Sequence, residues 1–308
     1  MKKVALFLAL CVACLAGWMA VFPEDATNAA FALERFRSGV EHKTVVVDGE
    51  TWHYLEGGAV DAPVLLLLHG FGGDKDNWTR FANSLVDSFR VIAPDLPGFG
   101  ESNRRYDQDH SLSAQRDRVF AFTEVLGLER LHLGGNSMGG HIAALYAHRY
   151  PRQIVSLALF NNAGVTSPDP SEVQLAAERG ESPLTLSSPA DFDRLLDLVS
   201  HKRPFIPWPA KDVLAKRSFA NSTFNRFFFD SYMADRPVGI ESLLPDIHMP
   251  VLILWGEYDR VLDVSSVDVM RPLLPQAKIV IMENTGHIPM LERPGETAEH
   301  YLEFLGGV

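Results

Sequence analysis

Cysteine is scarce in this chain, and acidic residues outnumber basic ones. The only two cysteines, Cys11 and Cys14, lie in the apolar N-terminal stretch, so the rest of the sequence supports neither a disulfide framework nor a cysteine metal site. The 28 basic and 39 acidic residues give a net charge of −11, which argues against a nucleic-acid partner. Histidine spacing typical of zinc, a P-loop and a G-x-G-x-x-G motif are also missing, so no cofactor or metal is expected.

Charge is absent from residues 4–22, which directly follow two lysines. An α-helix needs roughly 20 apolar residues to span a bilayer, so this stretch is long enough. The alternative is a cleaved signal peptide, whose apolar region is usually shorter, about 7 to 15 residues, and ends in small residues. Because Trp18 stands where a small side chain would be needed, we favour a retained transmembrane segment over residues 1–22.

The charges that flank this segment predict its orientation. Lys2 and Lys3 precede it, and Glu24 and Asp25 follow it. By the positive-inside rule, the N-terminus lies in the cytoplasm and the remaining chain lies across the membrane. In a bacterium this describes a single-pass protein of the inner membrane with a periplasmic domain. Residues 23–43 are expected to form a juxtamembrane helix or linker.

From residue 44 onward, short apolar runs alternate with longer helical patterns, which predicts an α/β fold with a mostly parallel sheet and helices on both faces. The runs expected as strands cover residues 44–48, 64–68, 91–93, 131–133, 154–159, 251–255 and 279–282. The helices of this part are expected near residues 77–88, 112–126, 138–149 and 295–304.

The alternation stops between residues 165 and 246, where proline, serine and aromatic-rich helical pieces replace the strands. We therefore expect an inserted helical cap over residues 165–246, within an α/β core made of residues 44–164 and 247–308. The aromatic side chains of this cap, such as Phe224 and Phe228, either pack the cap onto the sheet or line a cavity. An apolar acyl chain would fit beneath such an aromatic cap.

The motif G-x-S-x-G occurs at residues 135–139, between a predicted strand and a predicted helix. A sharp turn there exposes Ser137 at the carboxyl edge of the sheet, because the small residues Gly135 and Gly139 allow the chain to come close. The adjacent helix N-terminus favours developing negative charge. This context predicts that Ser137 is a nucleophile.

A serine hydroxyl needs an imidazole to remove its proton and a carboxylate to orient that imidazole. Asp259 and His287 each lie in a loop just beyond a predicted strand, and loops at the carboxyl ends of parallel strands converge on one crevice. The chain order Ser137, Asp259, His287 matches the order of this architecture. Glu257 and Asp263 are alternative acids, but Asp259 is favoured.

The HGFGG loop after the strand at 64–68 supplies a further element. Acyl transfer passes through an oxyanion, which needs two backbone donors. We expect one donor to be the N–H of Met138, the residue after the nucleophile, and the other to be the N–H of Phe71. We interpret His69, His141 and His148 as structural.

With these motifs, the chain resembles the α/β-hydrolase superfamily across residues 45–305. The matching segments are HGFGG, DLPGFGES, GGNSMGG, WGEYDR and GHIPMLERP. Within the superfamily, the chain resembles bacterial lipases related to monoacylglycerol lipases, especially a membrane-anchored phospholipase A. The resemblance implies a serine carboxylic ester hydrolase that releases fatty acids from lipid or phospholipid esters through an acyl-enzyme, without a cofactor. It also implies that a homodimer can form through the anchor region.

Two other functions fit parts of the pattern. GGNSMGG also occurs in carbon–carbon bond hydrolases of aromatic ring cleavage, which share the cap and the three catalytic residue types. Those enzymes usually carry a serine and a glycine-proline turn after the HG pair, where this chain has Phe71. The second alternative is a noncatalytic lipid-binding protein. Dehalogenases and epoxide hydrolases place an aspartate at the nucleophile position, so Ser137 argues against both.

Overall fold

The strands of this computed structural model, which describes residues 1–234 and 239–307, form one sheet of eight. In chain order they are β1 (Val40–Val47), β2 (Glu50–Gly57), β3 (Val64–Leu68), β4 (Arg90–Pro94), β5 (Leu131–Asn136), β6 (Ile154–Phe160), β7 (Val251–Gly256) and β8 (Lys278–Met282). The spatial order is β1-β2-β4-β3-β5-β6-β7-β8. The β1–β2 and β2–β4 pairs are antiparallel and the other pairs are parallel, so the predicted α/β fold with a mostly parallel sheet is confirmed.

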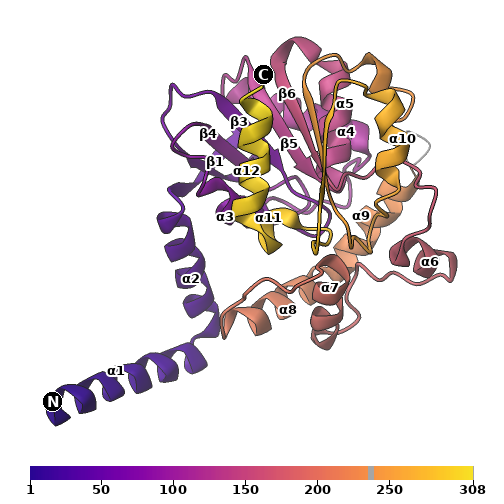
Figure 1. Cartoon of the computed structure of the whole chain (residues 1–308). Coiled ribbons are helices and arrows are strands. Elements are labelled where there is room, and N and C mark those ends of the chain that lie inside the picture. The colour runs from indigo at the N-terminus through magenta and orange to yellow at the C-terminus, as the bar shows by residue number, and fades with distance from the viewer. Residues whose placement is uncertain (235–238, 308) are drawn as a thin grey trace.

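Helices cover both faces of this sheet. The α-helices are α1 (Lys2–Val21), α2 (Pro23–Arg37), α3 (Thr79–Ala82), α4 (Leu112–Val125), α5 (Met138–Arg149), α6 (Glu172–Glu178), α7 (Phe192–Val199), α8 (Ala210–Ala220), α9 (Ser222–Ala234), α10 (Ser266–Leu273), α11 (Pro289–Glu292) and α12 (Pro294–Leu305). Short 3₁₀ turns are η1 (Lys75–Trp78), η2 (Pro151–Gln153), η3 (Pro189–Asp191) and η4 (Leu244–Asp246). In Figure 1, α3 and α12 lie in front of the sheet, and α4 and α5 pack on its other face.

The position of β3 inside the sheet explains why its sequence is apolar throughout. Leu65 and Leu67 belong to the buried cluster under α3 and α12, whereas Leu66 and Leu68 belong to the cluster under α4 and α5. Successive side chains of a strand point to opposite faces, so a strand covered on both faces buries every residue. All four leucines are fully buried.

The first two strands differ from the prediction. β1 begins at Val40, four residues before the expected start, and β2 was not predicted because it mixes charged with apolar residues. Trp52 and Tyr54 of β2 are nevertheless buried. The missed signal is the turn Asp48-Gly49, where φ is 50° and 79°, since two left-handed residues make the tight turn of a β-hairpin.

The helix predicted over residues 77–88 is much shorter in the structure. It consists of η1 and α3, and the chain continues through turns after Ala82. The turn region contains Asn83, Ser84, Asp87 and Ser88. Short polar side chains of this kind compete with the helical hydrogen bonds of the backbone, which explains why the helix ends early.

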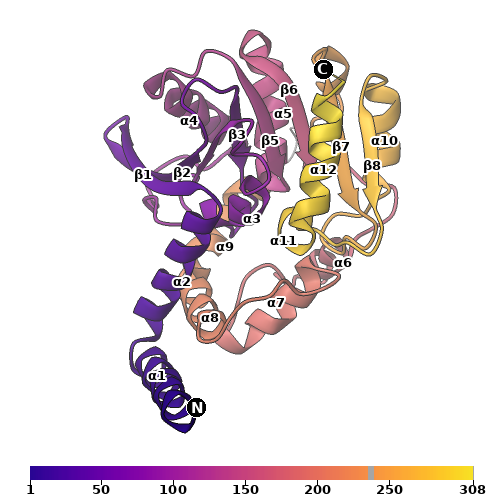
Figure 2. The ribbon, with the colours of Figure 1, turned by 60° about the vertical axis from the view of Figure 1, so that its left-hand side comes forward.

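The segment predicted as a cap, residues 165–246, contains α6 to α9 and no strand among its described residues; residues 235–238 lie outside the described part. α9 packs on the loops that follow β3 and β4. The Phe228 ring lies 4.6 Å from the ring of Phe99, and the Phe229 ring lies 5.4 Å from that of Phe71. Figures 1 and 2 place α7 and α8 at the end of the molecule opposite the C-terminus.

The two N-terminal helices differ in their surroundings. α1 protrudes from the rest of the molecule, has no buried residue, and is long and apolar enough to cross a membrane, with a mean hydropathy of 2.5 (Figure 1). α2 packs beside α8 and β1 (Figure 2). Ion pairs at 2.5–2.6 Å attach α2 to the remaining chain: Glu24–Arg217, Glu34–Arg80 and Arg35–Asp76.

Candidate active site

Ser137 occupies a strained turn between β5 and α5. Its backbone has φ 54° and ψ −121°, in the left-handed half of the map that side chains other than glycine rarely adopt. Four hydrogen bonds hold the turn: Ser137 N donates to the carbonyls of Phe160 and Asn161, and Ser137 O accepts from Ala163 N and His141 N. The half-buried serine is therefore fixed at the end of β5, as the motif predicts.

The glycines on either side of Ser137 are required by close backbone contacts. A Cβ on Gly135 would lie 2.3 Å from Gly139 O, and a Cβ on Gly139 would lie 2.3 Å from Leu68 O. No side chain can be accommodated at such distances without moving the backbone. The spacing of the G-x-S-x-G motif is thus set by the packing of β5, α5 and the end of β3.

His287 and Asp259 form a buried, hydrogen-bonded pair. His287 Nδ1 lies 2.7 Å from Asp259 Oδ2, and each residue is only 5% exposed. The other carboxylate oxygen, Oδ1, accepts hydrogen bonds from the backbone N–H groups of Val261 and Leu262 at 2.8 and 2.9 Å. With Nδ1 directed at the carboxylate, Nε2 is the ring nitrogen left to accept a proton.

The two alternative acids have other partners. Asp263 Oδ1 accepts from Ser265 N at 2.9 Å, as an ordinary Asx turn, and Glu257 Oε2 accepts from Asn284 N at 3.3 Å. Of the three candidate acids, Asp259 is the one that hydrogen-bonds the His287 ring.

Two asparagines connect the loops of this site, and neither was identified from the sequence as a site residue. Asn136 Nδ2, next to Ser137, donates to the carbonyl of His287 at 3.0 Å. Asn161 Nδ2 donates to Asp259 Oδ2 at 2.7 Å, and it also lies 3.4 Å from Gly286 O. The signal that could have revealed them is their position, since each ends or directly follows one of two adjacent strands, β5 and β6.

The HGFGG loop lies against the serine turn. A Cβ on Gly70 would lie 3.1 Å from Ser137 Cβ. Met138 is the first residue of α5, so its N–H has no partner within the helix. The ring of Phe71 packs edge-on against Phe99 and Phe229, which fixes the loop beneath α9.

His69 supports this loop from behind. Its Nε2 accepts from Leu96 N at 3.0 Å, so the proton is on Nδ1, which donates to Gly70 O at 2.8 Å. Burial lowers the pKa of His69, which favours this neutral form. The side chain therefore joins the loops after β3 and β4 and has both ring nitrogens in use.

Comparisons with known proteins agree with this fold. The model of the alpha/beta hydrolase family matches residues 65–300. The chain belongs to the α/β-hydrolase family. This hydrolase is 48% identical, with a TM-score of 0.91, to the crystal structure of a membrane phospholipase A described as a novel bacterial virulence factor; the match covers 100% of this chain and 99% of that chain.

Lipases are also among its relatives. Lipase 1 of Psychrobacter immobilis is 35% identical over 282 residues, 91% of this chain and 89% of the lipase. The monoacylglycerol lipase ABHD6 of Bos taurus is 33% identical over 256 residues, 80% of this chain and 76% of that enzyme. The predicted resemblance is confirmed, and this hydrolase is a carboxylic ester hydrolase of the lipase and phospholipase type.

Asn161 offers a test of whether its hydrogen bond to Asp259 matters for turnover. We expect Asn161→Gly to lower kcat for an acyl ester about 10- to 100-fold with little change in KM, because a hydrogen bond to a charged group contributes about 1.5–3 kcal/mol. Glycine also accepts the φ of 45° at this position, so the loss reports on the amide rather than on backbone strain. Steady-state kinetics with a p-nitrophenyl ester measure the effect.

A matched control is Asp48→Gly, which makes a similar change at a positive-φ residue in the β1–β2 turn. This variant should keep the wild-type kcat. An Asn161→Gly variant with unchanged kcat would show that the amide does not position Asp259.

Proposed function

We propose that this hydrolase cleaves acyl esters of membrane glycerophospholipids, with Ser137 as nucleophile, His287 as general base and Asp259 as the carboxylate that orients it. The observation that carries the proposal is the buried Asp259–His287 hydrogen bond, in loops that Asn136 and Asn161 tie to the serine turn. The 48% identity to a membrane phospholipase A supports the choice of substrate.

The proposed reaction has two halves. His287 Nε2 removes the hydroxyl proton as Ser137 Oγ bonds to the ester carbonyl carbon, and the carbonyl oxygen becomes an oxyanion held by the N–H groups of Phe71 and Met138. Collapse of this intermediate expels the alcohol, which takes the proton from His287 and leaves an acyl-enzyme. Water then attacks the acyl group by the same route and releases the fatty acid. Neither half requires a cofactor.

We assign the acyl chain to the side of the site covered by the cap, residues 165–246. Two contacts support this role: Phe229 of α9 packs on Phe71, and the carbonyl of Val199, at the end of α7, accepts a hydrogen bond from His287 N at 3.0 Å. The cap thus contacts both the proposed oxyanion loop and the loop of the proposed base. The remaining core, predicted as residues 44–164 and 247–308, would begin at Val40 instead, where β1 begins.

We further propose that residues 1–22 anchor the chain in the bacterial inner membrane, with the N-terminus in the cytoplasm and the catalytic domain in the periplasm. The unburied helix α1 and the lysines that precede its apolar part support this arrangement. Of the predicted linker 23–43, residues 23–39 would then connect the anchor to the domain, because β1 already begins at Val40. A homodimer through the anchor region is part of the same proposal.

Ser137→Ala should lower ester hydrolysis by about 10⁴-fold or more, because removal of the nucleophile leaves only binding and oxyanion stabilisation. A fluorophosphonate probe should label the wild-type chain at Ser137 and leave the variant unlabelled. Ser84→Ala, at an exposed serine, is the control and should behave like the wild type. Retained turnover in Ser137→Ala would refute the mechanism, and a wild type that the probe does not label would favour a noncatalytic lipid-binding protein.

A substrate panel distinguishes phospholipid hydrolysis from the carbon–carbon alternative. We expect release of fatty acid from long-chain phosphatidyl lipids in mixed micelles and little turnover of vinylogous diketo acids, because the cap contacts are aromatic and apolar. Mass spectrometry of the released acids gives the rates. Faster cleavage of a diketo acid than of any lipid ester would reverse the assignment.

Cysteine labelling in intact cells tests the topology. A maleimide that cannot cross the inner membrane should label Val60→Cys, which replaces a side chain that is 77% exposed, and should leave Lys3→Cys unlabelled. The parent chain is the background control, since Cys11 and Cys14 would lie within the bilayer. The opposite labelling pattern would invert the orientation. Chemical crosslinking should give a dimer band that disappears when residues 1–22 are deleted, if the anchor joins two copies.

A further inference from the structure

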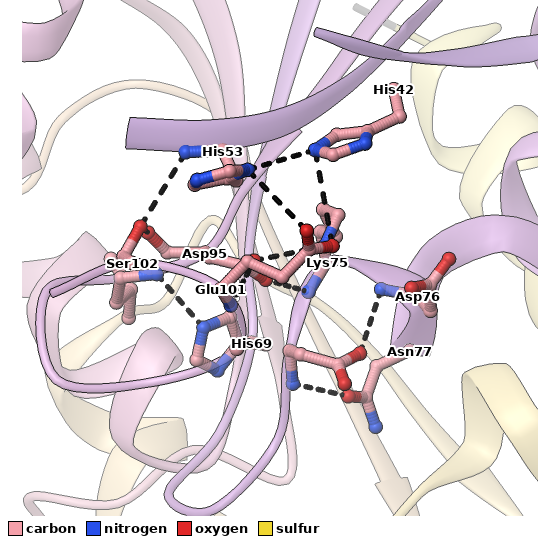
Figure 3. A network of polar contacts seen from close by, with 12 residues as sticks. His42, His53, His69, Lys75, Asp76, Asn77, Asp95, Glu101 and Ser102 are labelled. Carbon is pink, nitrogen blue, oxygen red and sulfur yellow. Dashed lines mark hydrogen bonds and ion pairs between the residues drawn. The ribbon is translucent and has the colours of Figure 1, made fainter. Parts of the chain in front are cut away.

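A second cluster of titratable side chains lies where the β1–β2 hairpin meets the loop after β4 (Figure 3). His42 comes from β1, His53 from β2 and Glu101 from the loop. His42 pairs with Leu55 in the hairpin register, and His53 is two residues from Leu55, so the two imidazoles are diagonal neighbours on one face. None of these residues takes part in the proposed reaction.

The nitrogen and oxygen atoms of this cluster lie close together. His42 Nε2 lies 3.0 Å from His53 Nδ1, within hydrogen-bond distance, while Glu101 Oε2 lies 3.6 Å from His53 Nδ1 and Glu101 Oε1 lies 3.9 Å from His42 Nε2. One ligand atom from each residue lies within 4.8 Å of the other two. A tetrahedral zinc ion about 2.0–2.2 Å from each ligand needs ligand atoms about 3.3–3.6 Å apart. The two imidazole nitrogens would therefore have to separate by a few tenths of an ångström, and one oxygen of the Glu101 side chain, which is 50% exposed, would have to come within this spacing of both.

The charges around the cluster also suit a cation. Lys75 Nζ lies 2.7 Å from Glu101 Oε1 and 2.9 Å from Asp95 Oδ2, so one ammonium group serves two carboxylates and one net negative charge remains. Arg35, the other cation near His42, is itself paired with Asp76.

We propose that His42, His53 and Glu101 form a binding site for a divalent transition-metal ion such as Zn²⁺, with water completing the coordination. Imidazole ligands favour zinc, nickel and copper over magnesium and calcium, which prefer all-oxygen sites. The ion would cross-link the β1–β2 hairpin to the loop after β4. That loop is the one whose Leu96 N–H is held by His69. The proposal does not depend on the proposed function, because no ligand belongs to the catalytic set.

The test uses the full-length chain in detergent micelles, freed of metal by a chelator and of any affinity tag. We expect titration calorimetry with Zn²⁺ to give one bound ion per chain, and zinc to raise the unfolding temperature, since an ion that binds only the folded state stabilises it. His42→Ala and His53→Ala should each weaken zinc binding by at least about tenfold, and Glu101→Gln should weaken it less because one oxygen donor remains.

His248→Ala is the matched control, because it removes an exposed histidine elsewhere and should bind zinc like the wild type. Unfolding temperatures measured without zinc show whether any variant is simply destabilised. Co²⁺ offers a second readout, since its visible absorption should appear with the wild type and be lost in His42→Ala. The proposal is overturned if the wild type binds no zinc, or if the double variant His42→Ala/His53→Ala binds it equally well.

Discussion

The buried hydrogen bond between Asp259 and His287 is the interaction on which the arrangement of the candidate active site depends. A carboxylate removed from water is costly unless its oxygens are paired. Asp259 meets this requirement with four donors: two backbone N–H groups on Oδ1, and the His287 ring and the Asn161 amide on Oδ2. Of these four donors, only the His287 ring and the Asn161 amide connect Asp259 to other loops.

The parallel part of the sheet provides the geometry for this bond. β5, β6, β7 and β8 are consecutive neighbours, and the loops that leave their carboxyl ends carry Ser137, Asn161, Asp259 and His287 in that order. Residues more than a hundred positions apart in the chain therefore meet at one edge. The amides of Asn136 and Asn161 then form hydrogen bonds between these loops, which the strands have already brought together.

This division between the strand order and the hydrogen bonds between loops explains what could be predicted from the sequence. The G-x-S-x-G turn, the parallel strands and the helices α4, α5 and α12 follow from local patterns of apolar residues, glycines and strand-to-helix alternation. The sequence favours Asp259 over Glu257 and Asp263 because Glu257 is closer to the strand end and Asp263 lies beyond Val261 and Leu262. By contrast, β2 lacks a simple apolar pattern, and a turn-rich stretch after α3 interrupts an otherwise helical periodicity.

Contacts between side chains that are far apart in the chain could not be predicted from the sequence. Asn161 reads as an ordinary loop residue until β6 and β7 are placed side by side. Likewise, the spacing of His42, His53 and Glu101 matches no metal motif, because a hairpin register and a separate loop bring them together. The expectation that the chain has no metal site rests on local motifs alone, which do not include residues brought together by strand pairing and a separate loop.

The helix α2 has a mechanical consequence. Its 15 residues span about 22 Å. Three ion pairs attach it to the hydrolase core, through Asp76 and Arg80, and to the helix α8, through Arg217. A flexible linker in place of α2 would let the catalytic domain rotate freely about the end of α1. α2 is instead held to the domain at three points, so a change in the direction of α1 relative to the domain has to occur at Phe22, between the two helices.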